Sequence, residues 1–289
     1  MISSGIFLPF FQSWYKMVIT MHQMRKADMK KKIYMTLLVI SMLVLVIAGY
    51  NVLTLYMEYR AGINEYEDLA QYVSVEVPEE ENVVEEVVET EEKPSLINVS
   101  LDIDYAGLKE INGDFAGWLY YEPLEISYPI VRGQDNDYYT KYTFEREKNK
   151  SGAIFMDAYN WIDYADYNTF IYGHNMRNGT MFGKLKKLLN DEEGIVEANP
   201  YFYIFTEEKA YMYEIFAVYN TRTEYDTYDL IHTKEEQEAN LESIRERATW
   251  MSDKEVTGED KIVTLSTCYG VNTRNRTVVQ GVLIAAEER

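Results

Sequence analysis

The chain has 289 residues and a formal net charge of −20. An acidic balance of this size argues against binding to a nucleic-acid backbone, which requires clustered lysine and arginine. The single cysteine, Cys268, leaves no partner for an internal disulfide, and no group of Cys, His and acidic residues has the spacing of metal ligands, so we expect no metal site and no cofactor.

An apolar run near the N-terminus predicts one membrane-spanning helix. Residues 33–57 contain no charged side chain, and a helix of that length covers about 37 Å, enough to cross a hydrocarbon core of about 30 Å. Basic residues gather before the run and acidic residues after it, so by the positive-inside rule we expect residues 1–32 in the cytoplasm and the chain after Met57 outside. The alternative, a cleaved signal peptide, requires a shorter apolar core and a small-residue cleavage site, which Tyr50 and Tyr56 fit poorly.

The first residues raise a separate hypothesis about the start of the protein. Residues 5–15 are apolar but too short for a second span, and Pro9 interrupts them. We hypothesise that the natural start is Met24 or Met29, because either gives a compact beginning that is first basic and then apolar. The intact mass of the native membrane protein tests this, and a species that contains residues 1–23 would refute it.

An acidic stretch follows the apolar run and predicts a spacer. Residues 73–92 contain neither a basic nor an aromatic side chain, and a segment with so much like charge and so little bulk cannot bury a core, although its valines resemble a strand. We therefore expect residues 58–96 to form an extracytoplasmic spacer that is extended from about residue 65 to residue 94. The part before Val73 has an alternative, a helix of the following domain, because Tyr66, Leu69 and Tyr72 recur at helical spacing.

Residues 97–289 predict a mainly β domain with a few helices. Eight segments combine β-branched and aromatic residues between turn signals, and eight short strands favour a closed or nearly closed barrel because closure removes exposed edges. Helices are expected at 182–189 and at 234–250, the second with Thr233 as its N-cap. The expected strands cover residues 117–121, 127–131, 152–156, 168–173, 201–206, 210–219, 261–267 and 277–285.

Three residues at the ends of expected strands are candidates for chemistry. Cys268 ends the run TLSTC, and an unpaired cysteine outside the cell is either a reactive thiol or an apolar filler of the core. His174 follows the strand 168–173 and opens a loop, where a scaffold presents functional side chains, although a hydrogen-bonded surface histidine is the ordinary alternative. Arg276 lies eight positions after Cys268, and Arg274 competes with it because residues two apart on a strand share a face.

These motifs together resemble the class B sortases. The run TLSTC matches the nucleophile strand of that family, NTFIYGHNM (residues 168–176) matches its histidine strand and loop, and Arg276-Thr277-Val278-Val279 matches the arginine at the start of its last strand. The resemblance spans roughly residues 97–287 and implies an eight-stranded sortase-type β-barrel, preceded here by a transmembrane helix and an acidic spacer. Shorter matches are Gly117-Trp118, Tyr128-Pro129-Ile130-Val131 with Asp135-Asn136, and Ser151-Gly152-Ala153-Ile154-Phe155 with Asp157.

The resemblance implies a cysteine transpeptidase of Gram-positive bacteria, anchored in the cell membrane with its catalytic domain (97–289) outside. Such an enzyme cleaves a C-terminal sorting signal of a secreted protein after threonine through a thioester, and transfers the protein to an amine of peptidoglycan. Cys268 would be the nucleophile, His174 the general acid and base, and Arg276 the group that stabilises the oxyanion and holds the substrate. The implied partners are secreted proteins with signals of the Asn-Pro-x-Thr or Ser-Pro-x-Thr type.

Substrate contacts and competing functions stay open at this point. Ser266, Thr267 and Asn136 are expected in the peptide groove, and the first two have an equal alternative as ordinary strand residues facing a barrel layer. A sortase that polymerises pilins is one alternative function, and a non-catalytic membrane-tethered binding module with Cys268 in its core is another. Slow alkylation of Cys268 would favour the module. A papain-like hydrolase is disfavoured because its cysteine precedes its histidine in the chain.

Overall fold

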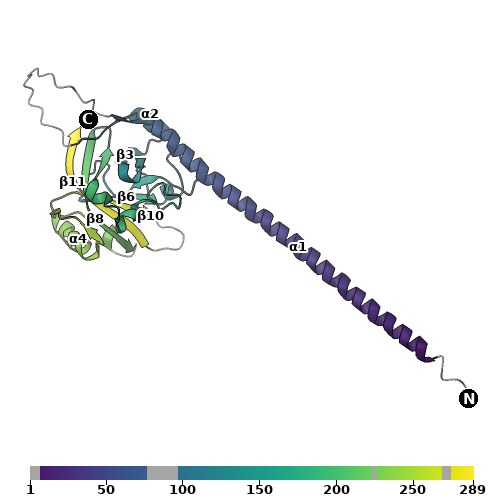
Figure 1. Cartoon of the computed structure of the whole chain (residues 1–289). Helices are drawn as coiled ribbons and strands as arrows, with labels where there is room; N and C mark the ends of the chain where they lie inside the picture. Colours follow the sequence, from purple (N-terminus) through teal and green to yellow (C-terminus); the bar gives the residue numbers. More distant parts are fainter. Residues whose placement is uncertain (1–6, 77–96, 223–225, 269–274) are drawn as a thin grey trace, which may run out of the picture. The chain divides into compact units, whose positions relative to one another are not determined.

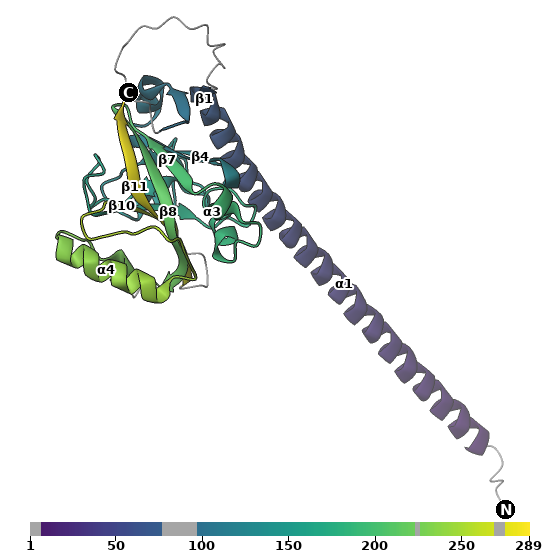
Figure 2. The same cartoon turned by 60° about the vertical axis from the view of Figure 1, so that its left-hand side comes forward.

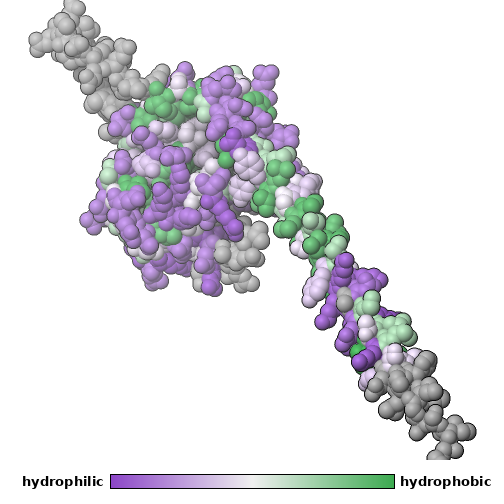
Figure 3. Space-filling view, turned by 45° about the vertical axis from the view of Figure 1, so that its right-hand side comes forward, coloured by the Kyte–Doolittle hydropathy of each residue, from purple (hydrophilic) through white to green (hydrophobic). Residues whose placement is uncertain are grey.

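One long helix, α1 (Phe7–Leu69), begins the part of the chain that the computed structural model describes, which comprises residues 7–76, 97–222, 226–268 and 275–289 (Figure 1). The chain divides into two units, residues 1–57 and residues 58–289. In the first unit, α1 is long and apolar enough to cross a membrane, and every side chain from residue 33 to residue 57 is exposed. Figure 3 shows these apolar side chains as green patches along the helix, with hydrophilic ones on their N-terminal side.

The second unit begins with the end of α1, inside the segment that the sequence predicted to be a spacer. After Leu69 the chain forms a 3-10 helix, η1 (Ala70–Tyr72), and a strand, β1 (Val73–Glu76). The expectation of an extended chain is therefore wrong for residues 65–72, where the helical alternative applies, and the valine pattern at the start of the acidic stretch does form a strand. The rest of the expected spacer, residues 77–96, lies outside the described residues.

Burial of apolar side chains explains why α1 continues to Leu69. Leu69 is only 1% exposed and packs in a cluster with Leu101, Leu108 and Phe144 of the second unit. Strand β1 pairs antiparallel with β2 (Ser100–Ile103), which satisfies its backbone hydrogen bonds. The apolar residues at helical spacing therefore outweigh the acidic residues around them.

Eight strands close into a barrel, as the sequence predicted. Their order around the barrel is β11-β10-β6-β5-β4-β3-β7-β8, and β8 pairs back with β11 to close the ring. The ends of the observed strands differ from the predicted ones by up to three residues. The strands are β3 (Phe115–Tyr121), β4 (Ile126–Val131), β5 (Ile154–Met156), β6 (Asn168–His174), β7 (Tyr201–Phe205), β8 (Lys209–Arg222), β10 (Ile262–Cys268) and β11 (Asn275–Glu288).

Every barrel strand contributes to one buried cluster, which therefore fills the interior of the barrel. Leu119, Ile171 and Leu265 are among its members, and each is 1% exposed or less. A two-residue strand that the sequence did not predict, β9 (Trp250–Met251), adds to the edge of β8. The alternation of inward apolar residues along each strand thus accounts for the closed sheet.

Helices cover the outside of the barrel. Figure 2 shows α4 (Lys234–Arg247) beside β8 and β11, and Leu241 and Ile244 of α4 pack against residues of these strands. Thr233 caps α4 as predicted, and Glu236 completes a capping box. The helix expected at 182–189 is a shorter 3-10 helix, η4 (Leu185–Leu189). The remaining helices are α2 (Tyr105–Ile111), η2 (Glu122–Leu124), η3 (Tyr138–Thr140), α3 (Ile195–Ala198) and η5 (Asp226–Tyr228).

Candidate active site

The barrel topology places the cysteine and the histidine on neighbouring strand ends. Strands β6 and β10 run parallel in an unbroken register from the pair Asn168 and Ile262 to the pair His174 and Cys268. Adjacent strands lie about 4.8 Å apart, so two residues that are distant in the chain become backbone neighbours. The structure describes the backbone of Cys268 and not its side chain.

His174 is half-buried and hydrogen-bonded to the backbone of η3. Its Nε2 lies 2.7 Å from the carbonyl oxygen of Thr140. Because a carbonyl oxygen only accepts hydrogen bonds, Nε2 carries a proton in this arrangement and donates it to the bond. Nδ1 is then the ring nitrogen that is available to exchange a proton.

The surroundings of His174 disfavour its charged form. Burial lowers the pKa of His174 below its ordinary value of 6.5, and the positive charge of Arg276 lowers it further, whereas the hydrogen bond to the Thr140 carbonyl raises it. The net direction is downward, so the imidazole is neutral over more of the physiological pH range than a solvated histidine.

Arg276 lies at the start of β11, next to the end of β10. Its Nη1 donates a hydrogen bond of 2.9 Å to the carbonyl oxygen of Thr267, the residue before Cys268. Its guanidinium carbon lies 6.0 Å from the centre of the Tyr228 ring, within the range of a cation-π contact. Arg276 is thus fixed to the backbone beside the cysteine, whereas the competing Arg274 lies outside the described residues.

Ser266 and Thr267 are buried and use their hydroxyl groups inside the protein. Ser266 is fully buried, and its Oγ lies 2.8 Å from the hydroxyl oxygen of Tyr228. Thr267 is 2% exposed, and its Oγ1 accepts a hydrogen bond of 2.9 Å from the backbone N–H of Thr277. Both hydroxyl groups are thus engaged inside the protein, and a role of these residues in the peptide groove stays a prediction.

Asn136 belongs to a hydrogen-bonded group that includes Asp157 and Tyr172 of β6. Its Nδ2 donates to Asp157 Oδ2 at 2.8 Å, and its Oδ1 accepts from the N–H of Ala158 at 2.8 Å. The hydroxyl of Tyr172 donates to the same Asp157 oxygen at 2.9 Å. Tyr172 lies two positions before His174 on β6, and its ring centre is 6.3 Å from that of Tyr228. Asn136 is thus connected to the site through Asp157 and the two tyrosines.

Sequence reasoning missed several residues that shape the site. Thr140 contributes only its carbonyl oxygen, for which any residue type suffices, so no sequence signal exists. Gly152 was part of the matched run Ser151 to Phe155, and its left-handed φ of 56° is a signal that only the structure gives. A side chain at Gly152 would place its Cβ 2.9 Å from Cδ2 of the His174 ring, so the glycine permits close packing there. Tyr228 belongs to no motif that we identified.

The arrangement brings together the residue types that acyl transfer through a thioester requires. Cys268 is a backbone neighbour of His174, and Arg276 is bonded to the residue before Cys268, so a candidate nucleophile, a candidate proton carrier and a candidate cation for an oxyanion come from adjoining strands. Among the described residues, no group of three or more His, Cys, Asp or Glu side chains could hold a metal ion.

Comparison with known proteins identifies the family. The model of the sortase domain family matches residues 119–284, more than half of the chain. The chain therefore belongs to the sortase family, whose members are cysteine transpeptidases, and this confirms the resemblance in the motifs.

The relatives are class B sortases. The curated Sortase B of Listeria monocytogenes is 37% identical over 192 residues, covering 65% of this chain and 77% of the relative. Sortase B of Staphylococcus aureus is 28% identical over 261 residues, covering 88% and 99%. The crystal structure of Clostridium perfringens sortase B is 34% identical, with a TM-score of 0.57 over 62% of this chain and 99% of that one. A Staphylococcus aureus sortase B-substrate complex is 30% identical, with a TM-score of 0.59 over 62% and 84%.

Proposed function

We propose that this chain is a membrane-anchored sortase that cleaves a sorting signal after threonine and joins the secreted protein to an amine of peptidoglycan. The observation that carries the proposal is the backbone pairing of Cys268 with His174 beside the fixed Arg276, in a chain that belongs to a transpeptidase family. Cys268 is the nucleophile, His174 is the general acid and base, and Arg276 is the cation that stabilises the oxyanion.

In the first half-reaction Cys268 reacts as a thiolate. Its sulfur attacks the carbonyl carbon of the threonine, a C–S bond forms, and the C–N bond of the scissile peptide breaks. The neutral imidazole of His174 takes up the thiol proton of Cys268 and then passes it from Nδ1 to the leaving amine, so this half-reaction ends with a neutral imidazole. The lowered pKa of His174 makes the imidazolium a stronger acid, which favours this transfer.

In the second half-reaction an amine replaces the sulfur. The neutral imidazole of His174 accepts a proton from the incoming amine, a C–N bond forms, and the cysteine leaves as a thiolate. The same lowered pKa keeps the imidazole neutral and ready to accept this proton at neutral pH. One histidine therefore serves both halves of the reaction.

Arg276 stabilises the negative oxygen that develops in each tetrahedral intermediate. Its hydrogen bond to the Thr267 carbonyl and its contact with the Tyr228 ring hold the guanidinium before substrate arrives. A cation that is already in place costs little reorganisation when charge develops. Ser266 holds the Tyr228 hydroxyl, and Thr267 holds the backbone of β11 at Thr277. Asn136 holds Asp157, which in turn binds the Tyr172 hydroxyl.

The membrane anchor and the substrate class complete the proposal. Residues 33–57 span the cell membrane, residues 1–32 lie in the cytoplasm, and the catalytic domain from residue 97 lies outside, with the end of α1 packed on it. The substrate is a secreted protein with an Asn-Pro-x-Thr or Ser-Pro-x-Thr signal, and peptidoglycan provides the amine. The helix α1 and the basic residues before its apolar run support the orientation.

Incubation of the full chain with a panel of labelled sorting peptides and candidate amines tests the function. Mass spectrometry separates hydrolysis, which adds water, from transpeptidation, which adds the amine. Cys268→Ala should abolish both products and the thioester adduct, because alanine has no nucleophile. A folded Cys268→Ala protein that still turns over a peptide would refute the mechanism.

A further inference from the structure

The end of α1, residues 58–69, packs against the segment 149–152. The carbonyl oxygen of Glu58 accepts a hydrogen bond of 2.9 Å from Nδ2 of Asn149, and its carboxylate pairs with the Lys150 ammonium at 2.9 Å. Gly62 permits close approach, because a Cβ at this position would lie 2.9 Å from Oγ of Ser151. Asn149 and Ser151 are themselves buried, so the contact belongs to the packed protein and not to a loose surface.

Tyr66 fixes the last residue of this segment. Its hydroxyl donates a hydrogen bond of 2.8 Å to the carbonyl oxygen of Gly152, 86 positions away in the chain. The Tyr66 ring meets the Tyr128 ring edge to face, with ring centres 5.4 Å apart. Burial raises the pKa of Tyr66 well above its ordinary value, so the hydroxyl stays protonated and can donate at any working pH.

Gly152 in turn touches His174 and the acceptor of its hydrogen bond. A Cβ built on Gly152 would lie 2.9 Å from Cδ2 of His174, 2.6 Å from the Tyr139 carbonyl oxygen and 3.2 Å from the Thr140 carbonyl oxygen. The Thr140 oxygen is the one that accepts from Nε2 of His174. A shift of Gly152 toward the ring would therefore displace the imidazole or its acceptor, and a shift away from the ring would open space beside it.

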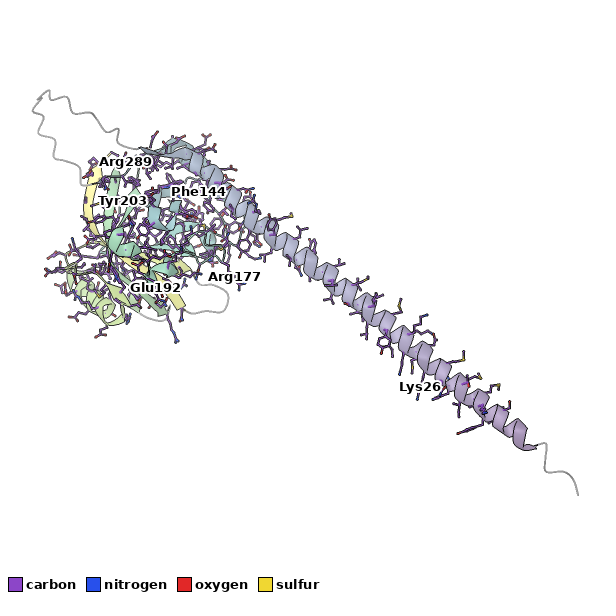
Figure 4. All side chains as sticks on the ribbon, in the orientation of Figure 1. Lys26, Phe144, Arg177, Glu192, Tyr203 and Arg289 are labelled. Atoms are coloured by element: carbon purple, nitrogen blue, oxygen red, sulfur yellow. The ribbon has the colours of Figure 1, made fainter. Side chains whose placement is uncertain are left out.

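The same helix end also faces the loop that follows His174. A pocket of about 250 Å³ separates the two, and Tyr128 connects them because its hydroxyl accepts a hydrogen bond of 3.1 Å from the N–H of Met181. Figure 4 labels Arg177 in this loop. The lining of the pocket includes Tyr59, Gly62 and Tyr66 of α1 and Met176 and Met181 of the loop.

We propose that the end of α1 is a positioning element for His174 and that Tyr66 acts on the histidine through Gly152. The inference rests on the proposed role of His174 as general acid and base. The helix that leaves the membrane would then also help to hold His174 in position. Tyr66 is a positioning residue, since its hydroxyl is bonded to the Gly152 backbone and acts on the imidazole only through it.

Tyr66→Phe tests the proposal, with Tyr59→Phe on the same helix as the matched control. Both variants of the full chain, in detergent micelles, lose one hydroxyl. NMR of ring-labelled histidine follows the titration of His174, assigned by the signal that His174→Asn removes. Peptide turnover gives kcat and KM separately. Thermal unfolding establishes that each variant is folded.

Tyr66→Phe should raise the titration midpoint of His174 toward its ordinary value, because a retreating Gly152 admits water to the ring. The value of kcat should fall roughly 3- to 10-fold, the effect of one lost hydrogen bond, with KM for the peptide unchanged. Tyr59→Phe should match the wild type in both measurements. A folded Tyr66→Phe protein whose His174 titrates at the wild-type midpoint overturns the proposal.

A second variant keeps the test decisive if Tyr66→Phe does not fold. Gly62→Ala pushes a methyl group toward Ser151 and should raise the His174 midpoint in the same direction, whereas Gly49→Ala, with nothing within 4 Å of its Cβ, should not. Equal midpoints in these two variants also overturn the proposal. If the wild type turns over no peptide and the midpoint still shifts, the proposed function fails and the positioning role stands.

Discussion

Gly152→Ala is the substitution for which the structure gives the most detailed prediction. Gly152 has a left-handed φ of 56°, and a Cβ there would lie 2.6 Å from the Tyr139 carbonyl oxygen and 2.9 Å from Cδ2 of His174. The carbonyl belongs to the backbone of η3 and cannot swing aside as the end of a long side chain could. The methyl group must therefore displace the backbone, the imidazole, or both.

Two separate costs set the magnitude. The left-handed conformation costs an alanine about 1–2 kcal/mol relative to glycine, and overpacking a filled site typically costs about 1–3 kcal/mol. We expect Gly152→Ala to lower the free energy of unfolding by about 2–5 kcal/mol, the sum of these two costs. Gly194→Ala is the matched control, because Gly194 has a similar φ of 65° and open space around its Cβ. It should lose only the backbone cost.

Urea unfolding of the unit from residue 58 onward measures both variants, and peptide turnover reports on His174. The difference between the two losses isolates the steric cost of about 1–3 kcal/mol. The value of kcat should fall in Gly152→Ala and stay near the wild-type value in Gly194→Ala, because the control touches no part of the site. Equal losses of stability in the two variants would show that Gly152 does not pack against the histidine as described.

Two further predictions concern the charged groups of the site. Arg276→Lys should reduce transition-state stabilisation, measured through kcat/KM, by about 2 kcal/mol or more, the usual effect of losing one oxyanion donor. Lysine keeps the charge but lacks the planar guanidinium with its paired N–H donors. Peptide turnover equal to that of the wild type would move the role to Arg274. Burial lowers the pKa of His174 below 6.5, so the unfolded chain binds this proton more readily than the folded chain. The neutral His174 therefore contributes its full stability above pH 6.5, and this contribution is lost as the pH falls through the lower pKa of the folded protein. Urea unfolding across this range should therefore show a steeper acid loss in the wild type than in His174→Asn, and parallel profiles would contradict the assignment.

The barrel strands could be predicted from the sequence because each shows its own local pattern. Segments such as residues 168–173 and 261–267 combine β-branched and aromatic residues between turns, so their identity as strands needs no knowledge of their partners. Strand β1 could not be predicted in this way, because Val73–Glu76 begins an acidic run and pairs only with the equally short β2. The helical spacing of Tyr66, Leu69 and Tyr72 left the extension of α1 to Leu69 open as an alternative, and burial of Leu69 against residues more than thirty positions away decides in its favour.

The candidate site was predictable where a motif determines the residue type. Cys268, His174 and Arg276 each end or begin a recognisable strand, and the topology then places His174 and Cys268 in register. The supports of these residues were not predictable. Thr140 acts through its main chain, Tyr228 comes from a segment without a motif, and Tyr66 lies in a helix that the sequence assigned to a spacer.

The closure of the barrel by β11 limits how Arg276 can be altered. From Asn275 to Gln280, β11 pairs without interruption with β8, and its first register shift comes only between Gln280 and Gly281. On its other edge Val278 and Val279 pair with Ser266 and Leu265 of β10. Because a slip of one position would turn every inward side chain outward, the pairings with β8 and β10 fix the position of Arg276 relative to Cys268. Insertions or deletions between Asn275 and Gln280 should therefore abolish catalysis, even where all three chemical groups are retained.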